Sequence, residues 1–141
     1  MKLSQQPEYL VAIPAAAVGK FSVARQQLEA LLMRVEAGDD LSTLGYLLQT
    51  LGDVEANLGN SERAMQLHER AISLDAQSPL PYLFYAQGLL RAFRDPEKSL
   101  TALNKAERVL LQDWRESDDE LPKSYYEREI QVLRDEIGRS R

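Results

Sequence analysis

Apolar residues recur every three or four positions through the middle of the chain, which is the period of one face of an α-helix. The series is Val54, Leu58, Ala64, Leu67, Ala71 and Leu74. It is interrupted once, by the sequence LGNS at residues 58–61. Gly59 can adopt the left-handed conformation that closes a helix, and Asn60 or Ser61 can cap the next helix. The pattern predicts two antiparallel helices joined by a tight turn over residues 51–77.

Small residues stand among the larger apolar ones of this segment, at Gly52, Gly59, Ala64 and Ala71. The distance between two packed helices depends on the size of the side chains at their contact. We therefore expect these positions to let the two helices, and the neighbouring pairs, approach closely.

The same arrangement returns further along the chain. Residues 48, 51, 52 and 55 match residues 82, 85, 86 and 89, and residues 64, 68, 71 and 74 match residues 99, 103, 106 and 109. The extra residue of the second set falls in the predicted turn AFRDPEK. A weaker copy lies upstream, where Gly19, Ala24, Leu28 and Leu31 stand 40 residues before their counterparts. The sequence therefore predicts three helical hairpins.

The residues Leu51-Gly52, Gly59, Ala64, Ala71 and Leu74-Asp75 resemble the tetratricopeptide repeat, a helix-turn-helix unit of ~34 residues. The resemblance implies an all-α fold: a right-handed superhelical array of antiparallel helix-turn-helix repeats with a C-terminal capping helix. It departs from the family pattern at Phe93, which replaces the usual turn glycine, and at Ala76, which replaces the usual proline.

We expect one domain, residues 1–141, with a degenerate repeat at 5–44, repeats at 45–78 and 79–112, an acidic linker at 113–121 and a capping helix at 122–138. Pro14 lies inside the first helix of the degenerate repeat and is expected to break or kink it. The linker between the first two repeats is placed at residues 36–42. The capping helix carries its apolar residues on one stripe, which suits a cover for the open end of an array. The stripe consists of Tyr126, Ile130, Leu133 and Ile137.

Composition limits the choice of function. The chain of 141 residues has a net charge of −5, which argues against a nucleic-acid binder. It has no cysteine, which excludes disulfides and thiolate chemistry. No apolar run reaches the ~20 residues that membrane insertion requires. The stretch from Tyr9 to Val18 has some features of a signal peptide, but Glu8 stands just before it and Pro14 interrupts it. We expect a cytoplasmic protein.

Candidate chemistry is sparse. His68 is the sole histidine, and its place in a repeat helix favours a packing role. No second histidine or cysteine completes a common metal site, and no phosphate-binding loop or nucleophile motif is present. We expect no enzyme activity, no cofactor and no bound metal.

The resemblance implies that the first helix of each repeat lines a concave groove. The implied partner-binding residues are Tyr46, Gln49, Asp53 and Asn57 in the second repeat, and Leu83, Gln87, Leu90 and Arg91 in the third. Related domains that grip a C-terminal carboxylate use Lys, Asn and Arg in this groove. The matching positions here are neither basic nor Asn, so we expect no carboxylate clamp; they are Tyr9, Ile13, Thr50, Leu80 and Phe84.

The helix expected over residues 81–93 is apolar nearly all round, so something should cover Leu83 and Leu90. Three alternatives remain for what covers them: a partner peptide, a second copy of the chain that makes a homodimer, or the chain's own helix over residues 126–137. The expected function is a non-enzymatic protein–protein interaction adaptor that binds a peptide or helix in a partly apolar groove. One alternative is a structural homo-oligomer that uses the same surface. The other is a small chaperone of the bacterial secretion type, because small acidic chains with about three such repeats resemble that class.

Overall fold

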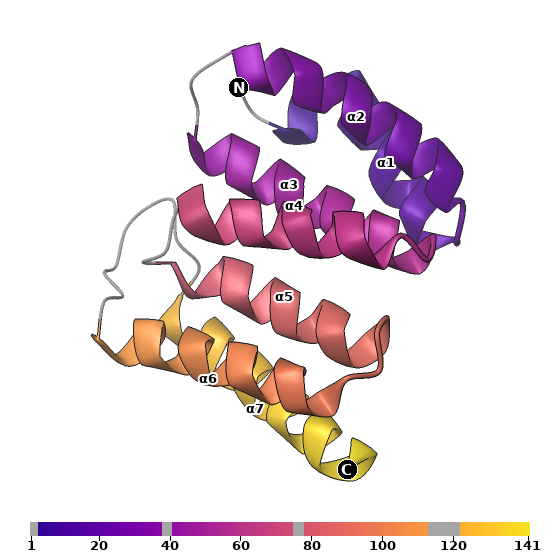
Figure 1. The fold of residues 1–141 in the computed structure, drawn as a ribbon. Coiled ribbons are helices and arrows are strands. Elements are labelled where there is room, and N and C mark those ends of the chain that lie inside the picture. The colour runs from indigo at the N-terminus through magenta and orange to yellow at the C-terminus, as the bar shows by residue number, and fades with distance from the viewer. Residues whose placement is uncertain (1–2, 38–40, 75–77, 113–121) are drawn as a thin grey trace. The chain divides into compact units, whose positions relative to one another are not determined.

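The protein is all-α in the residues that its structure, a computed structural model, describes: 3–37, 41–74, 78–112 and 122–141 (Figure 1). Those ranges contain no strand. In these ranges a short 3-10 helix, η1 (Leu3–Gln5), precedes seven α-helices. They are α1 (Pro7–Ala17), α2 (Phe21–Ala37), α3 (Leu41–Asn57), α4 (Ser61–Leu74), α5 (Pro79–Arg91), α6 (Pro96–Gln112) and α7 (Lys123–Ser140).

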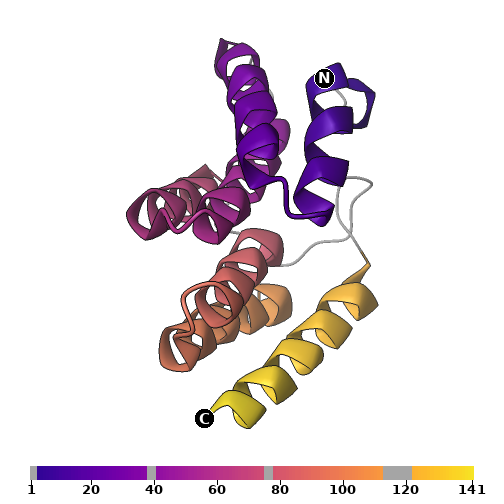
Figure 2. The same ribbon diagram turned by 90° about the vertical axis from the view of Figure 1, so that its right-hand side faces the viewer.

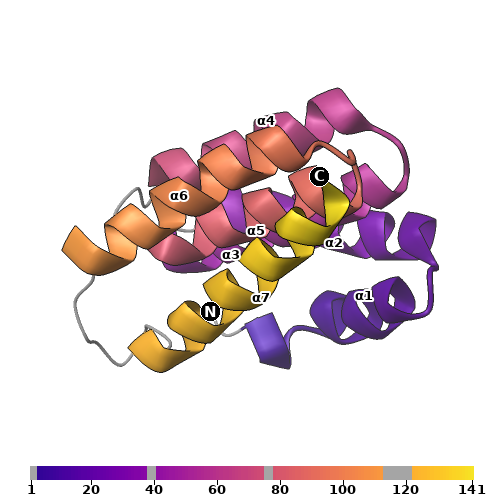
Figure 3. The ribbon, with the colours of Figure 1, turned by 90° about the horizontal axis from the view of Figure 1, so that it is seen from below.

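The chain divides into two compact units, Met1–Leu74 and Asp75–Arg141. In the first unit α3 packs along α4, α1 packs on α2, and α2 packs on α3 (Figures 1 and 2). In the second unit α5 packs along α6, and α7 lies against both (Figure 3). The single domain expected from the sequence stays a prediction.

The α1–α2 and α3–α4 turns have the same geometry. Each contains a glycine with positive φ, Gly19 at 83° and Gly59 at 86°, where a side chain would be strained. In both turns the amide after the glycine donates to the carbonyl four residues before the glycine. These bonds run from Lys20 N to Ala15 O at 2.8 Å and from Asn60 N to Glu55 O at 2.9 Å. The predicted role of Gly59 is confirmed.

The α5–α6 turn is built differently, because it contains no glycine and one more residue. Arg94 takes the left-handed conformation, with φ of 54°. Asp95 N donates to Leu89 O at 2.8 Å, and Asp95 Oδ1 accepts from Lys98 N at 3.1 Å, so the aspartate caps α6.

The helix bounds differ from the expected positions at three places. α3 begins at Leu41 instead of residue 45, because Leu44 is already packed in the core, and the linker before α3 shrinks to residues 38–40. α1 continues through Pro14, which removes one amide donor but leaves the bond from Val18 N to Pro14 O at 3.3 Å. α7 runs to Ser140, two residues beyond the expected end. The expected acidic linker, 113–121, lies outside the described residues.

The close approach expected at Gly52 is found between α3 and α4. A Cβ added at Gly52 would lie 2.8 Å from His68 Nε2, which is closer than carbon and nitrogen pack. His68 is fully buried, as its packing role predicts, and Ala64 and Ala71 are buried beside it on α4. The glycine therefore lets the imidazole lie directly on the α3 backbone.

Each unit has its own apolar core. The core of the first unit is formed mainly by leucines of α2 and α3, with the small residues Ala12 and Ala15 from α1. The core of the second unit combines α5 and α6 with the predicted stripe of α7. All four stripe residues are buried, namely Tyr126, Ile130, Leu133 and Ile137. The prediction that α7 covers apolar residues is confirmed within this unit.

Candidate functional site

The predicted partner-binding residues of α3 lie on its exposed side, with one exception. Tyr46 is 38% exposed, the Asp53 side chain is 36% exposed, and Asn57 is exposed. Gln49 was expected beside them, but it is 2% exposed. Its side chain turns into the helix packing, so it cannot contact a partner in this conformation.

α1 reaches this row of α3 through Tyr9. A hydrogen bond joins the Tyr9 and Tyr46 side chains, and burial together with this bond raises the pKa of Tyr9. Ile13, one turn along α1 from Tyr9, is 37% exposed, and Leu10, which follows Tyr9 directly, is 58% exposed. We call Tyr46, Asp53 and Asn57 of α3, together with Leu10 and Ile13 of α1, the inner row.

The charge of the inner row comes from Asp53. Its Oδ1 lies 3.4 Å from Nε2 of the buried His68, and the rest of the carboxylate is open to solvent. The other four members of the row carry no charge. An apolar and aromatic surface with one carboxylate suits a ligand that has apolar side chains and a nearby cation.

An ion pair fixes the start of α1 on α2. Arg34 Nη2 donates to Glu8 Oε2 at 2.9 Å and to Gln6 Oε1 at 3.0 Å, and Arg34 Nη1 binds the other Glu8 oxygen. The bond from Arg34 lowers the pKa of Glu8 to about 2. This two-point contact holds α1 in place and so positions Leu10 and Ile13.

The predicted residues of α5 do not form an open surface in the second unit. Leu83 is 1% exposed and Leu90 is 6% exposed, and both belong to the apolar cluster that includes the α7 stripe. Gln87 is half-buried. The expectation that Leu83 and Leu90 contact a partner is wrong, because α7 of the same chain covers them. This cover was one of the three alternatives named from the sequence.

Arg91 is exposed but is engaged by α7. Its guanidinium makes a two-point contact with Glu136, with Nη2 to Oε1 at 2.7 Å and Nε to Oε2 at 3.1 Å. The contact lowers the pKa of Glu136. Arg91 therefore fastens α7 onto α5, and its role is to hold the cover in place.

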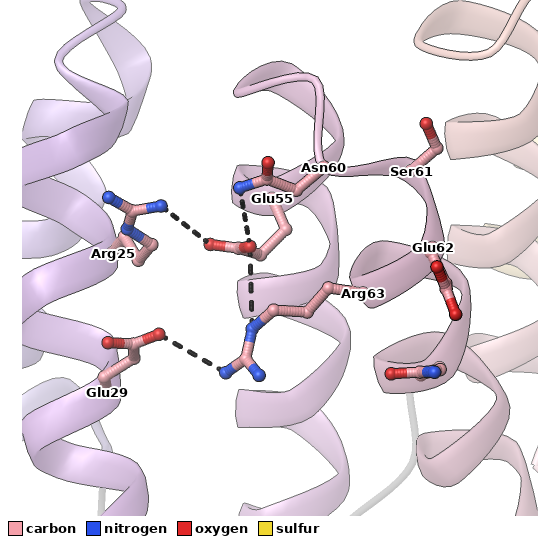
Figure 4. A pocket seen from close by; sticks show the side chains of 8 residues that line it. Arg25, Glu29, Glu55, Asn60, Ser61, Glu62 and Arg63 are labelled. Carbon is pink, nitrogen blue, oxygen red and sulfur yellow. Dashed lines mark hydrogen bonds and ion pairs between the residues drawn. The ribbon is translucent and has the colours of Figure 1, made fainter.

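The first unit also contains a polar hollow that was not among the predicted sites (Figure 4). The hollow measures about 740 Å³ and is lined by residues of α2, α3, α4 and the α3–α4 turn. At its base the Glu55 side chain is 1% exposed. Asn60 Nδ2 donates to Glu55 Oε2 at 3.0 Å, and Arg63 Nε lies 3.5 Å from the same oxygen. Arg25 Nη1 lies 3.7 Å from Glu55 Oε1.

The charges around the hollow alternate in sign and largely satisfy one another. Arg63 lies between Glu55 and Glu29, whose Oε1 accepts from Arg63 Nη2 at 3.3 Å. Two arginines and three glutamates line the hollow, so it has no excess of positive charge to attract an anion. Its effect is to join α2 to the α3–α4 pair. The one sequence signal for it is that Glu55 corresponds to Leu89, an apolar residue at the matching position.

In the described ranges, no three His, Asp or Glu side chains gather closely enough to hold a metal ion. Nor does any helix within the same ranges combine the length and apolar character needed to cross a membrane. No protein-family model, curated protein or solved structure matches the chain.

Proposed function

We propose that this protein is a non-enzymatic interaction adaptor built from helical hairpins of the tetratricopeptide type. The repeated turn supports the hairpin assignment, because Gly19 and Gly59 have the same conformation and the same hydrogen bonds 40 residues apart. The same offset matches Ala24 to Ala64, both fully buried.

The observation that carries the function is the inner row of the first unit. It offers Leu10, Ile13 and Tyr46 as exposed apolar or aromatic groups, with Asp53 as the one carboxylate of the row. Soluble proteins rarely leave such a patch on ordered helices without a contact to make. Exposed groups of this kind, with few charges, are typical of peptide-binding and helix-binding surfaces.

The ligand that fits the inner row is a peptide segment with apolar residues and one lysine or arginine. Burial of two or three apolar anchors contributes roughly 1.5–3 kcal/mol each. Most of that gain is offset by the loss of translational and conformational freedom. The expected affinity is therefore modest, on the order of micromolar.

A selection from a random peptide library on the purified protein tests the proposal. The selected peptides should combine apolar residues with a basic residue, and Asp53→Lys should weaken their binding about tenfold and reverse the charge preference. Glu69→Lys is the matched control, because Glu69 is exposed on α4 outside the inner row. Circular dichroism, repeated on Asp53→Asn, checks that the loss of the contact with His68 leaves the fold intact. Equal binding by Asp53→Lys and Glu69→Lys would reject the inner row as the site.

A further inference from the structure

The second unit contains a hollow of its own, where the α5–α6 turn meets the last turn of α7. It measures about 410 Å³ and is lined by Leu90, Arg91, Arg94, Pro96 and Ser140. We call these five residues the turn pocket. Leu90 and Pro96 give it an apolar wall, and the two arginines and the serine give it polar groups. Its volume lies within the range of sites that hold small molecules.

One of the two arginines of the turn pocket is already engaged, and the other is not. Arg91 is held by Glu136 through two hydrogen bonds. Arg94 is exposed, and it makes no hydrogen bond or ion pair with any other residue that the structure describes. The Ser140 hydroxyl donates to the Glu136 carbonyl at 2.9 Å. The charge that the turn pocket offers to a ligand is therefore that of the Arg94 guanidinium.

The carboxylates near Arg94 in the sequence have partners of their own. Asp95 Oδ1 accepts from Lys98 N at 3.1 Å, where it caps α6. Glu97 Oε1 lies 3.0 Å from Arg141 Nε. None of the five described residues that line the turn pocket is acidic. The turn pocket thus differs from the hollow around Glu55, where glutamates outnumber arginines by three to two.

Arg94 occupies its position at a conformational cost. Its φ of 54° is in the left-handed region, where Cβ crowds the backbone. The left-handed residues of the α1–α2 and α3–α4 turns are Gly19 and Gly59, which have no Cβ. An arginine therefore stands where a glycine would fit without strain. Strained residues of this kind are concentrated at binding sites, and the side chain found here is the cation that faces the turn pocket unpaired.

We propose that the turn pocket binds a small organic acid, with its carboxylate on Arg94 and its apolar part against Leu90 and Pro96. A planar guanidinium can hold a carboxylate through two parallel hydrogen bonds. A carboxylate brings one negative charge, which Arg94 balances. A phosphate brings between one and two charges at pH 7, and the excess would have no counter-charge in the turn pocket. The site shares no residue with the inner row.

Binding should be weak, because an ion pair open to solvent contributes little and a short apolar chain buries little area. We expect a dissociation constant on the order of 1 mM. Titration with hexanoate up to about 20 mM, followed by the amide shifts of the isotope-labelled protein, covers this range. The shifts should saturate and should be centred on residues 90–97 and 138–141. Hexylamine, which has a similar chain and the opposite charge, should produce no such shifts, and inorganic phosphate should bind more weakly than hexanoate. Equal shifts by hexylamine, or tighter binding of phosphate, would overturn the proposal.

Two substitutions separate the charge of Arg94 from its conformation. Arg94→Gln removes the charge but keeps a side chain in the left-handed position, and it should weaken hexanoate binding about tenfold. Arg108→Gln is the matched control, because Arg108 is an exposed arginine of α6 outside the turn pocket, and it should bind hexanoate as the wild type does. Arg94→Gly removes both the charge and the strain. It should lose hexanoate binding and yet unfold at a higher temperature than the wild type.

The same variants show how the proposal could fail. Hexanoate binding by Arg94→Gln that equals binding by the wild type overturns it. A lower melting temperature of Arg94→Gln with unchanged hexanoate binding would assign Arg94 to the turn alone. A melting temperature of Arg94→Gly no higher than that of the wild type would remove the strain from the argument and count against the site. Arg94→Gln should leave peptide selection by the inner row unchanged, so the two proposals fail separately.

Discussion

The α3–α4 pair and the α5–α6 pair place different side chains at corresponding positions. Gln49, Glu55 and His68 are buried in the first unit, and each is at most 2% exposed. The matching positions in the second unit are leucines, listed in the same order as Leu83, Leu89 and Leu103. All three leucines belong to the apolar cluster of that unit. At these three positions the first unit buries polar side chains and the second unit buries leucines, although both units also have an apolar core.

The difference follows from what surrounds each pair. In the second unit α7 supplies an apolar stripe, so leucines at these positions gain contacts and lose exposed area. In the first unit Glu55 of α3 faces Arg25 and Arg63, whose side chains are 38% and 48% exposed. These partners allow Glu55 to stay buried, because an unpaired buried group costs more than the net gain of a paired one.

The largest expected effect comes from removing the cover of the apolar pair. Tyr126 is fully buried in α7, and its ring packs edge-on against Tyr125 at 5.7 Å. Tyr126→Ala should lower the free energy of unfolding by ~3–5 kcal/mol, the range for loss of a large buried aromatic side chain. Chemical denaturation measures the loss.

The control for this change is Val132→Ala, because Val132 lies on the exposed side of α7. Hydrogen exchange should show faster opening over residues 79–140 in Tyr126→Ala, with residues 41–74 protected as in the wild type. Equal destabilisation by both substitutions would show that Tyr126 does not anchor the cover.

The second change makes the first unit resemble the second. Gly52→Ala introduces the residue found at Ala86, but its Cβ would lie 2.8 Å from His68 Nε2. Alanine gains up to about 1 kcal/mol over glycine in helix propensity, whereas overpacking a core costs about 1–3 kcal/mol. The overlap should outweigh the gain in helix propensity, so the free energy of unfolding should fall by about 1–2 kcal/mol.

A double substitution separates the overlap from other causes. Gly52→Ala with His68→Leu reproduces the Ala86 and Leu103 combination of the second unit and should recover part of the stability. Thermal unfolding followed by circular dichroism compares wild type, single and double variants in one cycle. If the double variant loses the sum of the two single effects, the overlap with the imidazole is not the cause.

Much of the fold follows from the sequence, because the evidence is local. The left-handed conformation of Gly59, the burial of His68 and the α7 stripe were all predicted from spacing and residue size. The continuation of α1 through Pro14 was not predicted. The one missing hydrogen bond is outweighed by the contacts of α1 with the rest of its unit.

The candidate site was harder to predict. The resemblance to the tetratricopeptide repeat implied Tyr46, Asp53 and Asn57, and all three have solvent-exposed surface on α3. The burial of Leu83 and Leu90 depends on a helix some 40 residues later in the chain, which periodicity cannot place. The ion network around Glu55 was missed for the same reason, because Arg25 and Arg63 come from two other helices.

The smallest expected effects compare the ion pairs that fasten one helix in each unit. Arg34 holds Glu8 in the first unit, and Arg91 holds Glu136 in the second. Both arginines lower the pKa of the carboxyl they bind, in the case of Glu8 from 4.5 to about 2. A carboxyl whose pKa is lower in the folded state binds fewer protons there than in the unfolded chain at intermediate pH. Its contribution to stability is therefore complete above pH 4.5 and is lost as the pH falls toward 2.

Unfolding measured between pH 7 and pH 2 should separate the two pairs. Glu8→Gln and Glu136→Gln should each flatten the acid side of the stability curve, because each arginine lowers the pKa of the carboxyl that it binds. Both effects should be small, since the pairs are open to solvent and salt screens them. Glu127→Gln is the control, because Glu127 is an exposed carboxyl of α7 outside both pairs. If all three variants show the same acid profile as the wild type, the two arginines position their helices without contributing to stability at neutral pH.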